Sequence, residues 1–176
     1  MWYFAYGSNL NVPAVTDWCR QHGHRAPAMK GGRAAVLDNY RLCFPIYSPY
    51  WGGGVGDIVY DPGKYVMGAL FEISDADLKT LDLKVGRKFD PTAGKEVGLY
   101  SQITVPVTPM GKHVAVQAIT YTGTAVEKNH IPPTQHYMDV VIQGAYGYGL
   151  SMMWISYLKS FSTQVGRKPR PAEGMV

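Results

Sequence analysis

The sequence predicts an α+β fold built on a bent or closed mixed sheet. Strand-like segments fill most of the first two thirds of the chain, and helical patterns gather toward its end. The chain has 176 residues, of which 46% are hydrophobic and 17% are charged. That length and composition are typical of one globular domain with a real core. We therefore expect a single domain over residues 1–162 and a loose C-terminal tail over residues 163–176.

The strands are predicted from residue type and from alternation. Residues 2–6 are short and rich in aromatics, as in a buried strand, and Gly7-Ser8-Asn9 ends that segment with a turn. Farther along, Ile103, Val105 and Val107 alternate with polar neighbours, which is the pattern of a half-buried strand. Strands are expected over residues 34–44, 66–73, 99–107 and 113–122.

Helices are predicted mainly from capping residues. Ser74 and Asp77 form a capping box ahead of a short helix. Thr134 is a suitable N-cap for a later helix that Gly149 closes, and Ser151 can open another helix that runs to Phe161. The apolar spacing over residues 12–21 also suggests a short helix.

Two segments lack a clear periodic pattern. The glycine-rich run over residues 51–58 is compatible with a mobile loop or with a close approach of the backbone to another backbone or a ligand. Residues 86–98 are rich in Gly, Lys, Asp and Pro, which indicates an exposed excursion.

Charge and cysteine content narrow the classes of function. The formal net charge of +4 is small for a nucleic-acid binder, so no nucleic-acid partner is expected. Cys19 and Cys43 form neither a disulfide framework nor a metal-ligand pattern, and the five histidines lack metal-ligand spacing, so no metal or cofactor is expected. The sequence shows no basic leader and no membrane-length apolar run. A cytoplasmic protein without a membrane partner is the simplest expectation, and a homodimer is left open.

The segment Phe4-Ala5-Tyr6-Gly7-Ser8-Asn9-Leu10 closely resembles a motif of the γ-glutamylcyclotransferases and of their AIG2-like and butirosin-pathway relatives. Further stretches match that family in the same order, up to about residue 158. They are Trp51-Gly52-Gly53, Val66 to Leu70 leading into Asp77 to Asp82, Leu99-Tyr100, and Tyr137 with Gly144-Ala145 and Gly149-Leu150.

This resemblance implies a barrel-like sheet with flanking helices and a pocket at the turn after the first strand. It also implies the family reaction, in which the α-amino group of a γ-glutamyl compound attacks its own γ-carbonyl and releases 5-oxoproline and an amine. The implied partner is thus a small γ-glutamyl or other carboxylate ligand. By the same resemblance the pocket is lined by Tyr3, Phe4, Ala5, Tyr6, Gly7, Ser8 and Asn9, and is closed by the hydroxyl groups of Tyr100 and Tyr137.

The turn also has a physical logic of its own. A strand that ends in Gly7-Ser8-Asn9 can direct successive main-chain N–H groups toward one point, which suits a carboxylate or a developing oxyanion. Gly7 would let a ligand come close to the backbone. The alternative is an ordinary turn in which the side chains of Ser8 and Asn9 cap local groups.

The sequence departs from the family where a general base is needed. The family pattern places a glutamate in a Leu-Asp-x-x-Glu-Gly segment, and here that position is Val85, which cannot carry a proton. Glu96, on the following excursion, is our candidate replacement, although the sequence favours a solvated loop glutamate beside Lys95. Asp82 is expected to be structural, and Lys84 could act as a base only if burial lowered its pKa strongly.

Two alternatives to a relocated base follow from Val85. One is a catalytically silent module that binds a small acidic or amino-acid-like ligand in the same pocket, and the other is an enzyme with different chemistry there. Loss of a positioned acid/base typically costs about 10²- to 10⁴-fold in rate. The fold and the pocket are therefore more firmly predicted than turnover.

Overall fold

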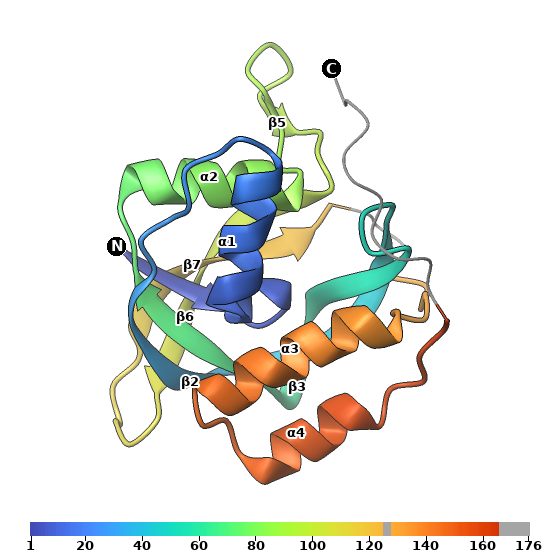
Figure 1. Ribbon diagram of the computed structural model, residues 1–176. Coiled ribbons are helices and arrows are strands. Elements are labelled where there is room, and N and C mark those ends of the chain that lie inside the picture. The colour runs from blue at the N-terminus through green and yellow to red at the C-terminus, as the bar shows by residue number, and fades with distance from the viewer. Residues whose placement is uncertain (125–127, 166–176) are drawn as a thin grey trace.

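The computed structural model describes residues 1–124 and 128–165. Five strands form a closed barrel (Figure 1). Around the barrel the order is β1 (Trp2–Ala5), β3 (Gly53–Glu72), β2 (Lys30–Ser48), β6 (Tyr100–Pro109) and β7 (Val116–Gly123). Strand β1 is antiparallel to β3 and parallel to β7, and its parallel pairing of Tyr3 with Ile119 closes the barrel. The expected α+β fold with a closed mixed sheet is confirmed.

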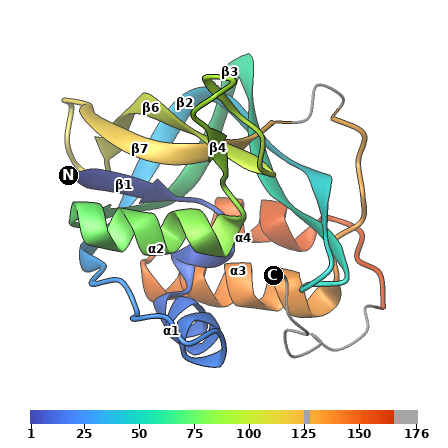
Figure 2. The same cartoon turned by 90° about the horizontal axis from the view of Figure 1, so that it is seen from above.

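The helices gather on one side of the barrel, as Figure 2 shows. They are α1 (Val12–Gln21), α2 (Asp75–Val85), α3 (Gln135–Gly147) and α4 (Met152–Lys159), with the short 3₁₀ turn η1 (Ser8–Leu10) after β1. The predicted capping box of α2 is present, because the Ser74 hydroxyl accepts from the N–H of Asp77 while the Asp77 carboxylate accepts from the N–H of Ser74. Within the part of the chain that is described, no helix has the length and apolarity needed to cross a bilayer.

Most of the glycine-rich segment, from Gly53 onward, belongs to strand β3, and Trp51 and Gly52 lie in the turn before it. Strands β2 and β3 pair along almost their whole length, from Lys30 opposite Glu72 to Ser48 opposite Gly53, with three register shifts. Of the two expected uses of these glycines, close backbone approach is the one observed. A side chain at Gly54 would overlap the carbonyl of Ile131. The extra strand length comes from long-range pairing, which local glycine content does not reveal.

The segment expected as an excursion contains a small hairpin, β4 (Phe89–Asp90) and β5 (Lys95–Glu96). Arg87 fixes this hairpin to the end of α2. Its guanidinium lies 3.0 Å from the carboxylate of Asp82 and 2.6 Å from that of Glu96. The excursion is thus exposed in part, yet it is anchored at its base.

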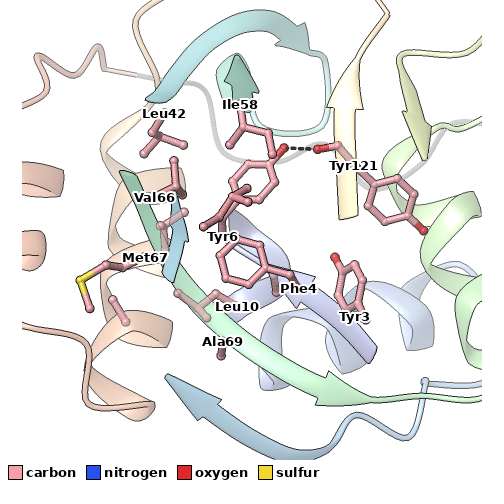
Figure 3. Close-up of a cluster of buried hydrophobic side chains, with 14 of the residues drawn as sticks. Tyr3, Phe4, Tyr6, Leu10, Leu42, Ile58, Val66, Met67, Ala69 and Tyr121 are labelled. Atoms are coloured by element: carbon pink, nitrogen blue, oxygen red, sulfur yellow. Dashed lines mark hydrogen bonds between the residues drawn. The ribbon is translucent and has the colours of Figure 1, made fainter. Parts of the chain in front are cut away.

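The core fills the barrel and the space beneath the helices. Figure 3 shows Phe4 and Leu10 among the buried aliphatic side chains. Gly144 of α3 lies against η1, where an added Cβ would sit 2.8 Å from the backbone carbon of Leu10. Helix α3 and η1 therefore pack backbone to backbone, which holds the turn after β1 in a fixed position.

The start of the expected C-terminal tail makes contacts with the domain. The Gln164 N–H donates to the carbonyl of Pro133, and the Thr163 hydroxyl donates to the side chain of Gln135. The rest of the expected tail, residues 166–176, lies outside the described residues.

Candidate active site

A cavity of about 270 Å³ opens beside the turn that follows β1. The turn contributes Tyr6 to Asn9, and further walls come from β3, the end of α2, β6, β7 and α3. The sequence-predicted residues that the structure brings to this cavity are Tyr3, Tyr6, Gly7, Ser8, Asn9, Tyr100 and Tyr137. These residues come from four separate elements, so the site exists only in the folded chain.

Phe4 and Ala5, which the resemblance placed in the pocket, do not line it. Phe4 is fully buried and points into the core, as Figure 3 shows. Ala5 pairs with Ala69 of β3, and its carbonyl lies against Gly68. Successive side chains on β1 point to opposite faces, so Phe4 faces away from the side on which Tyr3 lines the cavity. Ala5 shares the face of Tyr3, but it is buried in the barrel.

The hydroxyl of Tyr137 is the centre of a buried hydrogen-bond network. It accepts from the N–H of Gly56 at 2.8 Å and also forms hydrogen bonds with the backbone and side chain of Ser8. Burial raises the pKa of Tyr137 to about 12, so the phenol stays neutral. An added Cβ on Gly7 or Gly56 would lie 3.1 Å from this hydroxyl. In the structure these two glycines therefore make room for Tyr137.

Other phenols of the cavity are held in the same manner. Tyr100 donates to the carbonyl of Gly56 at 2.6 Å, and Tyr6 donates to the carbonyl of Tyr121 at 2.8 Å, the bond drawn in Figure 3. Burial raises the pKa of Tyr6 and Tyr100 well above the ordinary value. These groups thus act as neutral hydrogen-bonding walls and carry no charge near pH 7.

Asn9 offers an unused acceptor in this cavity. Its side-chain nitrogen donates to the hydroxyl of Tyr3 at 2.8 Å, while its Oδ1 is buried and has no hydrogen-bond partner among residues 1–124 and 128–165. A buried polar atom without a partner is costly, so such atoms commonly meet a ligand or a water. Asn9 Oδ1 is therefore a candidate contact for an N–H group of a ligand.

Lys84 brings a cationic group to the same place. It lies in the last turn of α2, and its Nζ is 3.4 Å from the hydroxyl of Ser8. Burial lowers the pKa of Lys84 to about 8. Lys84 thus has the lowered pKa that a lysine needs in order to act as a base. Among the described residues, Lys84 is the one charged side chain that lines the cavity.

Glu96, the predicted replacement base, is not brought to the cavity. Its carboxylate accepts hydrogen bonds from Arg87 at 2.6 and 2.8 Å. Asp82 also stays away, since its carboxylate binds Arg87, Gln102 and Tyr121, in agreement with the structural role expected for it. Val85 does line the cavity, and no carboxylate of the described residues does.

An apolar wall at the mouth of the cavity was only partly foreseen. Trp51 and Leu99 belong to stretches that match the family motifs, whereas Tyr50 and Leu83 do not. Leu83 and Leu99 are both about half exposed, so they border solvent at the opening. Leu83 and Leu99 lie together at the opening because the chain returns to the end of α2 after the hairpin of β4 and β5. A local sequence pattern does not predict this return.

No group of three or more His, Cys, Asp or Glu side chains that could hold a metal ion occurs among residues 1–124 and 128–165. The polar chemistry of the cavity as described rests instead on phenols, an amide, a hydroxyl and an amine.

We predict that Tyr137→Phe lowers both stability and ligand binding. The substitution leaves the buried N–H of Gly56 without its acceptor, which costs about 1–3 kcal/mol of unfolding free energy. Chemical denaturation measures this loss. Tyr146→Phe on the same helix is the matched control, because Tyr146 is exposed and a change within about 0.5 kcal/mol is expected there. Equal effects of the two substitutions would contradict the role given to the Tyr137 hydroxyl.

Comparisons with known proteins agree with this architecture. The AIG2-like family model matches residues 65–158. The γ-glutamylcyclotransferases of Bos taurus and Homo sapiens are each 30% identical to the chain over 163 residues, which are 90% of this chain and 77% of each relative.

Solved structures show the same fold. One named "Gamma-glutamyl cyclotransferase" superposes with a TM-score of 0.74 and 23% identity, covering 98% of this chain and 94% of its own. An uncharacterized Homo sapiens protein superposes with a TM-score of 0.71 and 26% identity, covering 93% of this chain and 88% of its own. With the fold, the turn after β1 and the extent of these matches in agreement, the chain belongs to the γ-glutamylcyclotransferase-like family, which includes the AIG2-like proteins.

Proposed function

We propose that the chain binds γ-glutamyl amines or γ-glutamyl amino acids in this cavity and cyclises them to 5-oxoproline with release of the amine. The observation that carries the proposal is the cavity at the turn after β1, where the polar groups of Ser8, Asn9 and Lys84 meet beside neutral phenols. Family membership supports the same reaction, since the curated relatives are named γ-glutamylcyclotransferases.

The polar groups complement the head of such a substrate. The unpaired Oδ1 of Asn9 can accept from an α-amino group, and the Ser8 hydroxyl can donate to a carboxylate. The apolar wall of Trp51 and Leu99 then faces the leaving amine. Holding the α-amino nitrogen close to the γ-carbonyl carbon supplies the proximity that an intramolecular attack needs.

Product analysis tests the proposal. The purified protein is incubated with γ-glutamyl amines that carry small, polar and aromatic amine groups, and 5-oxoproline is quantified by chromatography. Matched N-acetyl derivatives serve as controls, because their blocked nitrogen cannot attack the carbonyl. We expect 5-oxoproline from the free-amine substrates alone. Absence of product from every free-amine substrate at high protein concentration would overturn the proposal.

A second candidate function has one specific observation in its favour. Val85 and the lack of a described carboxylate in the cavity lining fit a silent module that binds a small acidic or amino-acid-like ligand without converting it. Saturable calorimetric binding of glutamate or 5-oxoproline, together with no product from any γ-glutamyl compound, would favour this alternative.

A further inference from the structure

We propose that the ε-amino group of Lys84 is the proton acceptor and donor of the cyclisation, in place of a carboxylate at position 85. This inference rests on the proposed function and adds to it the group that moves the protons. Three features of the structure lead to it, namely the position of Lys84 in the cavity, the engagement of the nearby carboxylates elsewhere, and the environment of its amine.

The position of Lys84 is suited to the reacting atoms. Residues 84 and 85 end the same helix, and both line the cavity. The Nζ of Lys84 lies 3.4 Å from the hydroxyl of Ser8, the neighbour of Asn9 in the turn. Ser8 and Asn9 both line the cavity, so we expect the Lys84 amine to lie near a substrate amine bound at Asn9 Oδ1, as a general base must.

The two carboxylates near the end of α2 are held outside the cavity lining, and Glu96 Oε2 is buried there without a hydrogen-bond partner among the described residues. Arg87 binds both Asp82 and Glu96, and Asp82 also accepts from Gln102 at 2.6 Å and from Tyr121 at 2.8 Å. Neither acid lines the cavity. Lys84 itself forms no ion pair with a described residue, so its amine is not neutralised by a fixed partner.

The surroundings of Lys84 favour its neutral form. Cys19 of α1 is the titratable group whose charge acts on it most directly, and burial raises the pKa of that thiol. The remaining titratable groups of the cavity are the phenols of Tyr3, Tyr6, Tyr50, Tyr100, Tyr121 and Tyr137. Burial raises the pKa of each of these phenols, so none supplies a negative charge that would hold the amine protonated. A lysine with a pKa of about 8 exists in both protonation states near neutral pH, as an acid/base catalyst requires.

The proton balance of the step closes with Lys84 alone. The neutral amine removes one proton from the α-ammonium of the substrate, and the freed nitrogen attacks the γ-carbonyl carbon to form the ring C–N bond. The Lys84 ammonium gives its proton to the departing nitrogen as the amide C–N bond breaks. The ring nitrogen loses its second proton to the released amine, which leaves as an ammonium, and Lys84 is neutral again.

The first test compares kcat/KM of the wild type with that of Lys84→Met across pH 6 to 10. Methionine keeps an apolar stem of similar length but cannot carry a proton. We expect the substitution to lower the rate about 10²- to 10⁴-fold, and the wild-type rate to rise with pH through a midpoint near 8. Lys79→Met is the matched control, since Lys79 is exposed on the same helix, and its profile should follow the wild type.

A glutamate at position 85 separates the failure of this inference from the failure of the proposed function. We expect Val85→Glu to restore activity to the Lys84→Met variant. Wild-type turnover that survives Lys84→Met would overturn the role of Lys84 and leave the proposed function standing. If the wild type forms no 5-oxoproline and the Val85→Glu variant does, the role of Lys84 is also overturned, and the cavity is shown to bind the substrate productively. No product from any of these variants would overturn the proposed function and this inference with it.

A second measurement does not depend on turnover. The folded-state pKa of Lys84 lies below the ordinary lysine value of about 10.4, so the unfolded chain binds more protons between about pH 8 and 10.4. The free energy of unfolding of the wild type, relative to that of Lys84→Met, should therefore rise with pH across this window and fall as pH drops through 8. A difference that stays flat would contradict the shielded amine on which the inference depends.

Discussion

Substituting Val85 with glutamate in the Lys84→Met variant is expected to raise the rate of 5-oxoproline formation about 10²- to 10⁴-fold, the usual contribution of a positioned acid/base. Val85 already lines the cavity, so a longer side chain at this position is directed toward the bound substrate. A glutamate becomes a base at a lower pH than Lys84, because its ordinary pKa is about 4.3 and that of Lys84 is about 8. Activity that depends on the glutamate should therefore extend to lower pH than activity that depends on Lys84. Initial rates from pH 5 to 10 measure both effects.

Val85→Gln is the matched control for this prediction. Glutamine has the shape of glutamate and keeps its polarity, but it cannot accept and return a proton. A similar rise in rate with glutamine would mean that size or polarity at position 85 matters, and it would contradict a proton-transfer role for a carboxylate there.

The second large effect is expected from Asp57→Ala, which should lower the free energy of unfolding by about 3–5 kcal/mol. Asp57 is fully buried in β3, and its carboxylate accepts from the N–H of Gly123 at 2.7 Å and from Lys128 Nζ at 2.7 Å. The substitution removes the acceptor of the partly buried Gly123 N–H and the counter-charge of Lys128, whose ammonium retains only its hydrogen bond to the Gly123 carbonyl. Urea denaturation followed by tryptophan fluorescence measures the loss.

An exposed ion pair on the same strand gives the control. Asp61 lies 3.3 Å from Arg41, and both side chains are accessible to solvent, so Asp61→Ala should cost no more than about 1 kcal/mol. Combining Asp57→Ala with Lys128→Met removes the unpaired charge and should recover part of the loss. A cost for Asp57→Ala no larger than that for Asp61→Ala would show that the buried carboxylate is not a structural support of the barrel.

Local signals in the sequence were sufficient for the helices and for the first strand. Ser74, Thr134 and Ser151 all cap the helices that were expected to begin there, because a cap depends on residues only a few positions apart. The lengths of β2 and β3 were not predicted. Their pairing joins residues up to 42 positions apart, from Lys30 to Glu72, and the glycines that interrupt the pattern are accommodated by neighbouring backbone.

The site was predictable where a contiguous motif forms it and unpredictable where packing forms it. Ser8 and Asn9 follow directly from the turn after β1. Phe4 was assigned wrongly because the motif does not state which face of the strand each side chain occupies. The contacts of Arg87 with Glu96, and the burial that shifts the pKa of Lys84, arise only from tertiary packing.

The ion pairs of Arg87 with Asp82 and Glu96 also affect how a ligand reaches the protein. Arg87 pairs with these two acids, and Lys84 is the charged side chain of the described residues that lines the cavity. With a formal charge of +4 on the whole chain, we expect a positive electric potential at the entrance. Long-range attraction of this kind accelerates diffusional encounter with anions and weakens as dissolved ions screen it. Added salt should therefore slow capture of an anionic molecule more than it hastens escape.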